Sequence, residues 1–114
     1  MALPEYTLEF SESAAQDQIE LKAYIFKEFK YREYGNNFDK KMKSATKAIK
    51  DAASSIRPTS FYYRGYVIYM LVHKTYLFFY VVDEVNRNIT VLRVLKEGRN
   101  WMSIIKKWLA LSLK

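Results

Sequence analysis

Residues 66–95, YVIYMLVHKTYLFFYVVDEVNRNITVLRVL, contain three apolar runs separated by short polar segments. The runs YVIYMLV, TYLFFYVV and NITVLRVL are rich in β-branched and aromatic residues, which is typical of strands. The two-residue gap at His73–Lys74 predicts a tight hairpin, and DEVNRN (83–88) predicts a longer one. The middle run, Tyr76 to Val82, is apolar at every position, which predicts a central strand covered on both faces.

A strand and a helix are predicted at the start of the chain. In YTLEF (6–10) apolar and polar side chains alternate, which indicates a half-buried strand. Ser13 is followed by Gln16 three residues later, a capping-box pattern that predicts a helix start. Leu21, Ile25 and Phe29 recur every four residues and give this helix one apolar stripe.

A second helix is predicted from Phe38. We expect YGNN (34–37) to end the first helix, because glycine and asparagine accept the left-handed conformation of a helix end. Pro58 closes the helical region. The second helix has an apolar face made of Phe38, Met42, Ala45, Ile49, Ala52 and Ile56, and it turns Lys40, Lys43, Lys47 and Lys50 outward. The two helices are expected to form an antiparallel hairpin.

A last helix is predicted to open at Asn100 and to bury Trp101, Trp108 and Leu111. The element order is then β-α-α-β-β-β-α. This order predicts an α+β fold in which the helical hairpin packs on a mainly antiparallel four-stranded sheet. We expect one domain over residues 1–114, because the chain is too short for two.

The composition excludes several kinds of site. The chain has no cysteine, which excludes disulfides and thiolate chemistry, and its one histidine, His73, argues against a metal site. No cofactor is predicted. The longest apolar runs have seven residues, far below the roughly 20 that a membrane span needs. The acidic start MALPEYTLEF lacks the features of a secretory signal, so we expect a cytoplasmic protein with no membrane association.

The net charge of +7 is distributed unevenly. Residues 1–40 carry five Lys or Arg against eight Asp or Glu, whereas residues 87–114 carry seven against Glu97 alone. A basic C-terminal part predicts a polyanionic partner, either nucleic acid or an acidic protein. An ordinary solvated lysine surface is the alternative.

Four segments resemble the RelE/ParE superfamily of toxins from type II toxin–antitoxin systems, a group that includes plasmid-stabilisation toxins. These segments are YTLEFSESAAQDQIELKAYI (6–25), YRGY (63–66), LFFYVVDE (77–84) and ITVLRVLKEGRNW (89–101). The resemblance covers nearly the whole chain in the same order. It implies a growth-inhibiting protein that a small acidic antitoxin neutralises, and thus a toxin–antitoxin hetero-oligomer.

The resemblance leaves three functions open. ParE-like members inhibit DNA gyrase by binding it, whereas RelE-like members are metal-independent endoribonucleases that cut messenger RNA on the ribosome. A third possibility is a non-toxic module that still binds an antitoxin. RelE-like nucleases tend to carry several cations on the second and third strands and a tyrosine near the end. This chain has no lysine or arginine between Arg64 and Lys74 and no tyrosine after Tyr80, so the ParE-like function is favoured.

The candidate site residues are cations near the strand ends. Arg93 and Arg64 match arginines that the family places in the last strand and before the second strand, and a guanidinium can bind a phosphate or a carboxylate in bidentate fashion. Lys96 and Arg99 follow beside Trp101, which has helical spacing with Ile105 and Trp108 and is expected in the core. These five residues are the candidates for target or antitoxin binding, and the four cations among them are also the candidates for catalysis.

Two further residues are weaker candidates for acid–base catalysis. His73 titrates near neutrality, but its place at a hairpin indicates a surface histidine. Glu97 is a possible base beside Lys96 and Arg99, or it only balances their charge.

Overall fold

The computed structural model describes residues 4–29 and 32–112. Its five strands are β1 (Thr7–Phe10), β2 (Pro58–Tyr63), β3 (Tyr66–His73), β4 (Tyr76–Asp83) and β5 (Asn88–Lys96). Its three helices are α1 (Glu12–Phe29), α2 (Arg32–Ala52) and α3 (Trp101–Ser112). The predicted α+β class and helical hairpin are confirmed. None of the described helices has both the length and the hydrophobicity to cross a membrane.

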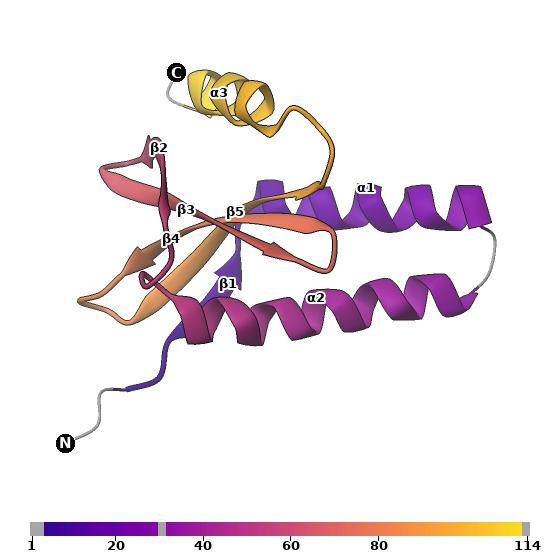
Figure 1. Ribbon diagram of the computed structural model, residues 1–114, viewed down its shortest axis with the longest axis horizontal. Helices are drawn as coiled ribbons and strands as arrows, with labels where there is room; N and C mark the ends of the chain where they lie inside the picture. Colours follow the sequence, from indigo (N-terminus) through magenta and orange to yellow (C-terminus); the bar gives the residue numbers. More distant parts are fainter. Residues whose placement is uncertain (1–3, 30–31, 113–114) are drawn as a thin grey trace.

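The strands form one mixed sheet in the order β1-β5-β4-β3-β2. All neighbours are antiparallel except β1 and β5, which run parallel. Figure 1 shows α1 and α2 side by side along one face of the sheet and α3 across the other face.

The sheet has one strand more than the four predicted. The additional strand, β2, pairs with β3 at the sheet edge. It begins with Pro58, which an edge strand tolerates at its first position because no ladder hydrogen bond is lost there. Its inward residues Phe61 and Tyr63 are half-buried against α3, but Tyr62 is exposed, so the strand lacks the strong hydrophobicity of β4.

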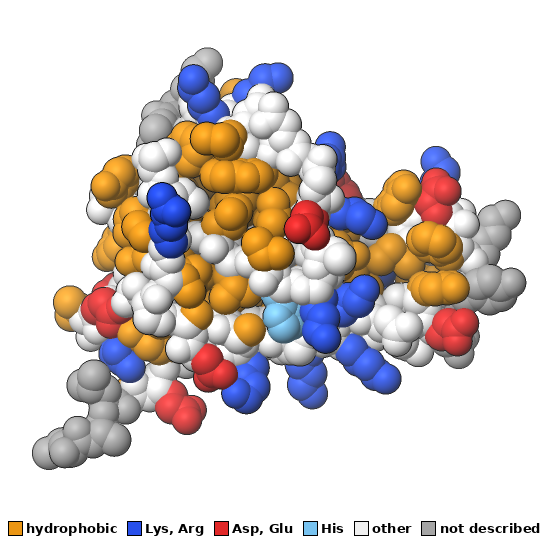
Figure 2. All heavy atoms as spheres, in the orientation of Figure 1, with side chains coloured by type: hydrophobic (Ala, Val, Ile, Leu, Met, Phe, Trp, Pro, Cys, Tyr) orange, Lys and Arg blue, Asp and Glu red, His pale blue; other side chains and the backbone are white. Residues whose placement is uncertain are grey.

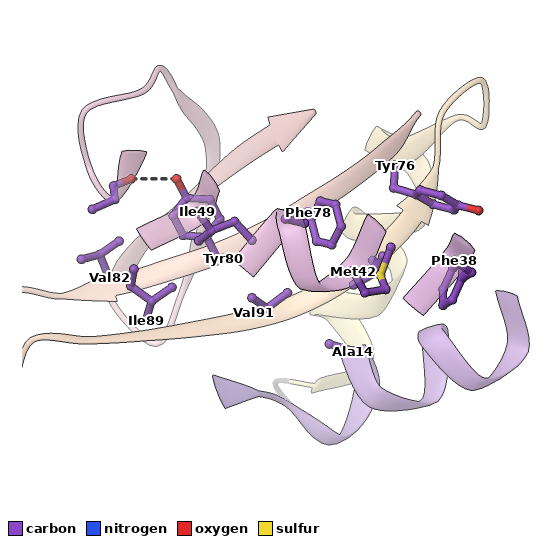
Figure 3. Packing of buried hydrophobic residues seen from close by; sticks show 13 residues of the cluster. Ala14, Phe38, Met42, Ile49, Tyr76, Phe78, Tyr80, Val82, Ile89 and Val91 are labelled. Carbon is purple, nitrogen blue, oxygen red and sulfur yellow. Dashed lines mark hydrogen bonds between the residues drawn. The ribbon is translucent and has the colours of Figure 1, made fainter. Parts of the chain in front are cut away.

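Strand β4 divides the core into two layers, as its uniform hydrophobicity predicted. Phe78 and Tyr80 face the helical hairpin, and Phe79 faces α3, all with 0 % exposure. Figure 3 shows the hairpin-side layer, in which Met42 and Ile49 of α2 lie over β4. Burial of this kind contributes about 1.5–3 kcal/mol for each large apolar side chain.

Helix α1 is described up to Phe29 and α2 from Arg32, so the YGNN segment lies within α2 and does not end α1. Gly35 is instead buried inside α2. A Cβ atom on Gly35 would lie 2.5 Å from Cζ of Phe26 on α1. The glycine therefore permits the close approach of the two helices, and the prediction that it ends a helix is wrong.

Helix α1 is capped by Ser11, two residues before the predicted Ser13. The Ser11 hydroxyl accepts a hydrogen bond from the Ala14 amide at 3.1 Å. Ser13 instead accepts one from the Trp108 indole at 3.3 Å, which ties α3 to α1. The start of α3 agrees with prediction, since the Asn100 side chain accepts a bond from the Ser103 amide at 3.4 Å.

The start of α1 replaces β1 as the partner of the outer edge of β5. The pairing with β1 ends at Phe10 and Val91. From there the Ser11 amide donates to the Val91 carbonyl, and the Ser11 hydroxyl donates to the Leu92 carbonyl, both at 2.9 Å. Asp17 then accepts a bond from the Val94 amide at 2.9 Å.

A β-bulge in β5 explains the arginine in this apolar strand. Phe79 pairs with Arg93 and the next residue, Tyr80, pairs with Val91, so Leu92 is the extra residue. The bulge lets Leu92 and Val94 both enter the core, on opposite faces of the sheet. Arg93 is left at the edge, where it meets Asp17.

Tyr80 ties the end of α2 to the central strand. Its hydroxyl donates to the carbonyl oxygen of Ala53 at 2.7 Å, and burial raises the pKa of this hydroxyl (Figure 3). Ala53 follows the last residue of α2 and has a positive φ of 43°. The hydrogen bond therefore satisfies a carbonyl at a helix end, where no intrahelical partner exists.

We predict that Tyr80→Phe lowers the free energy of unfolding by about 1–3 kcal/mol, because it leaves the Ala53 carbonyl without its donor. Urea denaturation measures this change. The control is Tyr69→Phe, since Tyr69 stacks on Tyr80 with ring centroids 5.7 Å apart and makes no such bond among the described residues. Equal stabilities for Tyr80→Phe and the unmodified chain would contradict the assigned role of the bond.

A polar cluster joins β1, the end of α2 and the β4–β5 turn. The Glu84 carboxylate accepts hydrogen bonds from the Tyr6 hydroxyl at 2.6 Å and the Ser54 hydroxyl at 2.8 Å. Arg87 lies 3.3 Å from the same carboxylate. The bonds from Tyr6 and Ser54, together with the charge of Arg87, lower the pKa of Glu84.

A carboxylate whose pKa is lowered on folding stabilises the protein above its ordinary pKa, and this contribution is lost as the pH falls through the folded value. We therefore predict that Glu84→Gln lowers Tm at pH 7, and that the difference from the unmodified chain shrinks toward pH 3. Thermal scans at both pH values measure the effect. Glu97→Gln is the matched control, because the Glu97 side chain is exposed. A difference that grows on acidification would refute this sign.

Candidate functional site

A groove opens where one end of the sheet meets the helical hairpin. The pairing of the strands brings the strand ends at this groove together: His73 of β3 pairs with Tyr76 of β4, and Tyr76 pairs with Lys96 of β5. The β3–β4 turn consists of Lys74 and Thr75, one residue later than predicted, and both have positive φ values, 52° and 71°. We call this cavity of about 590 Å³ the hairpin groove; it is lined by Ile25, Phe29, Tyr34, Asn37, Phe38, Lys40, Lys41, Ser44, Lys74, Thr75, Tyr76 and Lys96.

The hairpin groove is positively charged. Lys40 and Lys41 contribute from α2, Lys74 from the β3–β4 turn and Lys96 from the end of β5. Among the described residues that line the groove, none is acidic. Clustered like charges in a concave surface concentrate the potential and attract an anionic ligand.

The floor of the hairpin groove is apolar. Phe38 and Tyr76 are buried, with exposures of 2 % and 4 %, and their rings meet edge to face at 5.5 Å. Burial raises the pKa of the Tyr76 hydroxyl, so the floor stays neutral at physiological pH. At the rim Phe29 is 50 % exposed and packs on Tyr34, with ring centroids 5.0 Å apart.

A second groove lies on the other side of Lys96, between α1, the end of β5 and the start of α3. We call it the β5 groove; its volume is about 480 Å³, and it is lined by Asp17, Glu20, Leu21, Tyr24, Arg93, Val94, Leu95, Lys96, Arg99 and Ile104. Lys96 lines both grooves. Among the described residues, three cations line this groove, of which Lys96 and Arg99 are exposed.

Arg93 forms an internal ion pair with Asp17. Its Nε and Nη2 atoms donate to the two oxygens of the Asp17 carboxylate at 2.7 and 2.9 Å. The exposed fractions of the two side chains are 16 % for Arg93 and 9 % for Asp17. The guanidinium also lies 5.8 Å from the Trp108 ring. The expectation of an arginine free to bind an anionic partner is therefore corrected: this cation joins α1 to β5.

Arg64 lies at the opposite end of the sheet from Lys96. It precedes β3, whose first residue is near the Asp83 and Asn88 ends of β4 and β5, whereas Lys96 is at the far end of β5. Its guanidinium lies 5.1 Å from the Tyr63 ring, and its side chain is exposed. The structure therefore does not bring Arg64 together with Lys96 and Arg99.

Trp101, the first residue of α3, is half-buried. Its ring lies 5.4 Å from the Phe79 ring and 6.2 Å from the Phe61 ring. These contacts agree with the expectation of a core tryptophan.

His73 lies on the α2 side of the sheet, next to Ser44 of the hairpin groove, and Figure 2 shows the histidine colour beside Lys or Arg side chains. Its Nε2 atom is 2.7 Å from the Ser44 hydroxyl. The Ser44 hydroxyl also lies 3.1 Å from the Lys41 carbonyl oxygen, to which it can donate a hydrogen bond. The contact with Ser44 orients the histidine against α2.

Glu97 follows β5, and its amide donates to the Thr75 carbonyl at 2.8 Å. The bond fixes the chain between Lys96 and Arg99, and the Glu97 side chain remains exposed. Within residues 4–29 and 32–112, no group of three or more His, Cys, Asp or Glu residues is arranged to hold a metal ion.

Sequence reasoning did not select Lys40, Lys41 and Lys74 as site residues. Lys40 was predicted to face outward. It lines a groove only because α2 passes over the β3–β4 turn. The signal in the sequence was the lysine in a two-residue turn that lacks glycine. A turn of this kind is strained, and strain of this kind gathers at functional sites.

Three solved structures are similar to this fold. One is from the chromosomal ParDE system of P. aeruginosa, at a TM-score of 0.65 and 14 % identity, covering 82 % of this chain and 98 % of that one. Another is from the toxin–antitoxin complex RelBE2 of Mycobacterium tuberculosis, at a TM-score of 0.57 and 16 % identity, covering 82 % of this chain and 100 % of that one. The third is the isolated E. coli RelE toxin, at a TM-score of 0.52 and 16 % identity, covering 91 % of this chain and 99 % of that one.

Among curated proteins, no sequence matches the chain significantly. The family described as ParE toxin of type II toxin-antitoxin system, parDE, matches residues 8–101, from the second residue of β1 to the first residue of α3. The chain therefore belongs to the ParE toxin family of type II toxin–antitoxin systems.

Proposed function

We propose that this chain arrests growth in the cytoplasm by binding an essential protein, with DNA gyrase as the candidate target, and that an acidic antitoxin neutralises it. On this proposal the chain is not an enzyme and needs no cofactor. Lys96 and Arg99, whose side chains are exposed beside the β5 groove, are the cations that we assign to the target.

The observation that carries this proposal is the apolar sheet face beneath α3. Its buried side chains are Ile68, Leu77, Phe79, Val81, Leu92 and Leu95, together with Ile105 and Leu109 of α3. Cleavage of RNA by its own 2′-hydroxyl needs a general base, a general acid and cations around the phosphate. None of the buried described residues in this layer can supply these groups, which supports binding over cleavage.

The positions of the candidate catalytic residues also support binding. Arg64 is at the far end of the sheet, and Arg93 is held by Asp17. His73 is on the α2 side, bonded to Ser44. Lys96, Glu97 and Arg99 remain together near the end of β5, but they offer two cations and a single carboxylate, whereas the reaction needs both a general base and a general acid.

The test is induction of the chain without an antitoxin, followed by parallel analysis of RNA and DNA. We predict growth arrest with intact ribosome-bound transcripts and with altered DNA supercoiling or double-strand breaks. The Lys96→Ala/Arg99→Ala variant is expected to weaken the arrest by about tenfold or more, as loss of two anchoring charges does. The matched control is Lys106→Ala/Lys107→Ala, which removes two exposed lysines from α3.

Other outcomes select the other functions. Position-specific breaks in transcripts soon after induction, with normal supercoiling, would replace this proposal with a RelE-like endoribonuclease. Normal growth on induction of a folded chain would leave a non-toxic module that binds an antitoxin.

A further inference from the structure

We propose that the hairpin groove binds an acidic protein segment that inserts a large apolar side chain between α1, α2 and the β3–β4 turn. This inference rests on the proposed function, because it gives the acidic antitoxin its binding surface. The position of the groove comes from the fold, and of its four lysines only Lys96 was among the predicted site residues.

Charge complementarity gives the sign of the ligand. Lys40, Lys41, Lys74 and Lys96 approach the groove from three separate segments. Asp39 of α2 is paired with Lys22 of α1 at 2.8 Å, so this ion pair uses none of the four groove lysines. Lys41 contacts the Tyr76 ring at 6.0 Å, so its ammonium group is held over the apolar floor. Carboxylates placed along this rim would be attracted from several sides.

The apolar floor of the groove indicates a second property of the ligand, a large apolar side chain that enters the groove. Ile25, Phe38 and Tyr76 line a cavity of about 590 Å³, a volume within the range of binding clefts. Phe29 at the rim leaves half of its side chain in water. An aliphatic or aromatic side chain that enters this space would remove apolar surface on both partners from water, at about 25 cal/mol for each Å².

The aromatic rings favour a protein over a nucleic acid as the occupant. A single-stranded nucleic acid is bound through bases that stack on open ring faces. Phe38 and Tyr76 are almost fully buried and are packed on each other edge to face, and Phe29 packs on Tyr34. Rings that are buried or packed on each other in this way are poorly placed to stack on a flat base, so the groove suits a leucine or phenylalanine side chain better.

The test uses the purified full chain and a labelled peptide of about twelve residues in which glutamates flank two central leucines, a length typical of groove-bound segments. We expect saturable binding by fluorescence anisotropy. Replacing the glutamates by lysines, or the leucines by serines, is expected to abolish it. Lys41→Glu/Lys74→Glu is expected to weaken binding by about tenfold or more, because two attractive charges become repulsive.

The substitutions at Lys41 of α2 and Phe29 of α1 each have a control on the same helix. Lys43→Glu changes the charge of an exposed α2 lysine that does not line the groove. Phe29→Ser is expected to weaken binding, whereas Ile19→Ser, on a 62 % exposed residue of α1, is expected to leave it unchanged. Circular dichroism verifies that each variant is folded.

The absence of peptide binding up to about 1 mM, a concentration at which only very weak binding would be missed, would overturn the inference. Equal losses of peptide affinity for Lys43→Glu and Lys41→Glu/Lys74→Glu would also overturn it. So would displacement of the labelled peptide by single-stranded oligouridylate at a lower concentration than the unlabelled peptide needs. The last result would assign the groove to nucleic acid. Peptide binding does not depend on toxicity, so a chain that binds the peptide without arresting growth would refute only the proposed function.

Discussion

Among the described residues, no strand pairs with the outer edge of β5 beyond Val91. The rest of the structure depends on how the start of α1 forms hydrogen bonds with the backbone groups of that edge. Ser11 bonds to Val91 and Leu92, and Asp17 accepts bonds from the Val94 amide and the Arg93 guanidinium. An unpaired backbone group at a half-buried edge costs about as much as a lost hydrogen bond. The carboxylate of Asp17 satisfies the amide and neutralises the arginine at once, which fixes the position of α1 on the sheet.

The position of α1 in turn creates both grooves. Leu21 and Tyr24 of this helix line the β5 groove, and Ile25 and Phe29 line the hairpin groove. The exposed Lys96 lies between them, at the end of the strand to which α1 is bonded. The two sides of the sheet thus differ in chemistry: α3 covers an apolar layer, whereas the lysines gather where the hairpin passes the strand ends. This division supports the proposal that the chain acts by binding.

Much of the fold could be predicted from local patterns, whereas in the candidate site only Lys96 and Arg99 were predicted among the cations that we assign to binding. The uniform hydrophobicity of β4 and the Asn100 cap are properties of neighbouring residues, and both were predicted. Gly35 was misjudged because its role depends on Phe26 of another helix. Arg93 was expected to bind a partner because its own partner, Asp17, is 76 residues away in the sequence. The lysines of the hairpin groove are similarly brought together only by the tertiary fold.

The most direct test of this account is a double-mutant cycle on Asp17 and Arg93, with free energies of unfolding from urea denaturation of the unmodified chain, Asp17→Ala, Arg93→Ala and the double variant. We predict a coupling of about 2 kcal/mol or more, because removal of one partner leaves the other as an unpaired, mostly buried charge. Asp17→Ala is expected to cost more than Arg93→Ala, since it also takes the acceptor from the Val94 amide. A coupling below about 0.5 kcal/mol, the usual limit of additivity for independent sites, would contradict the claim that this pair holds α1 on β5.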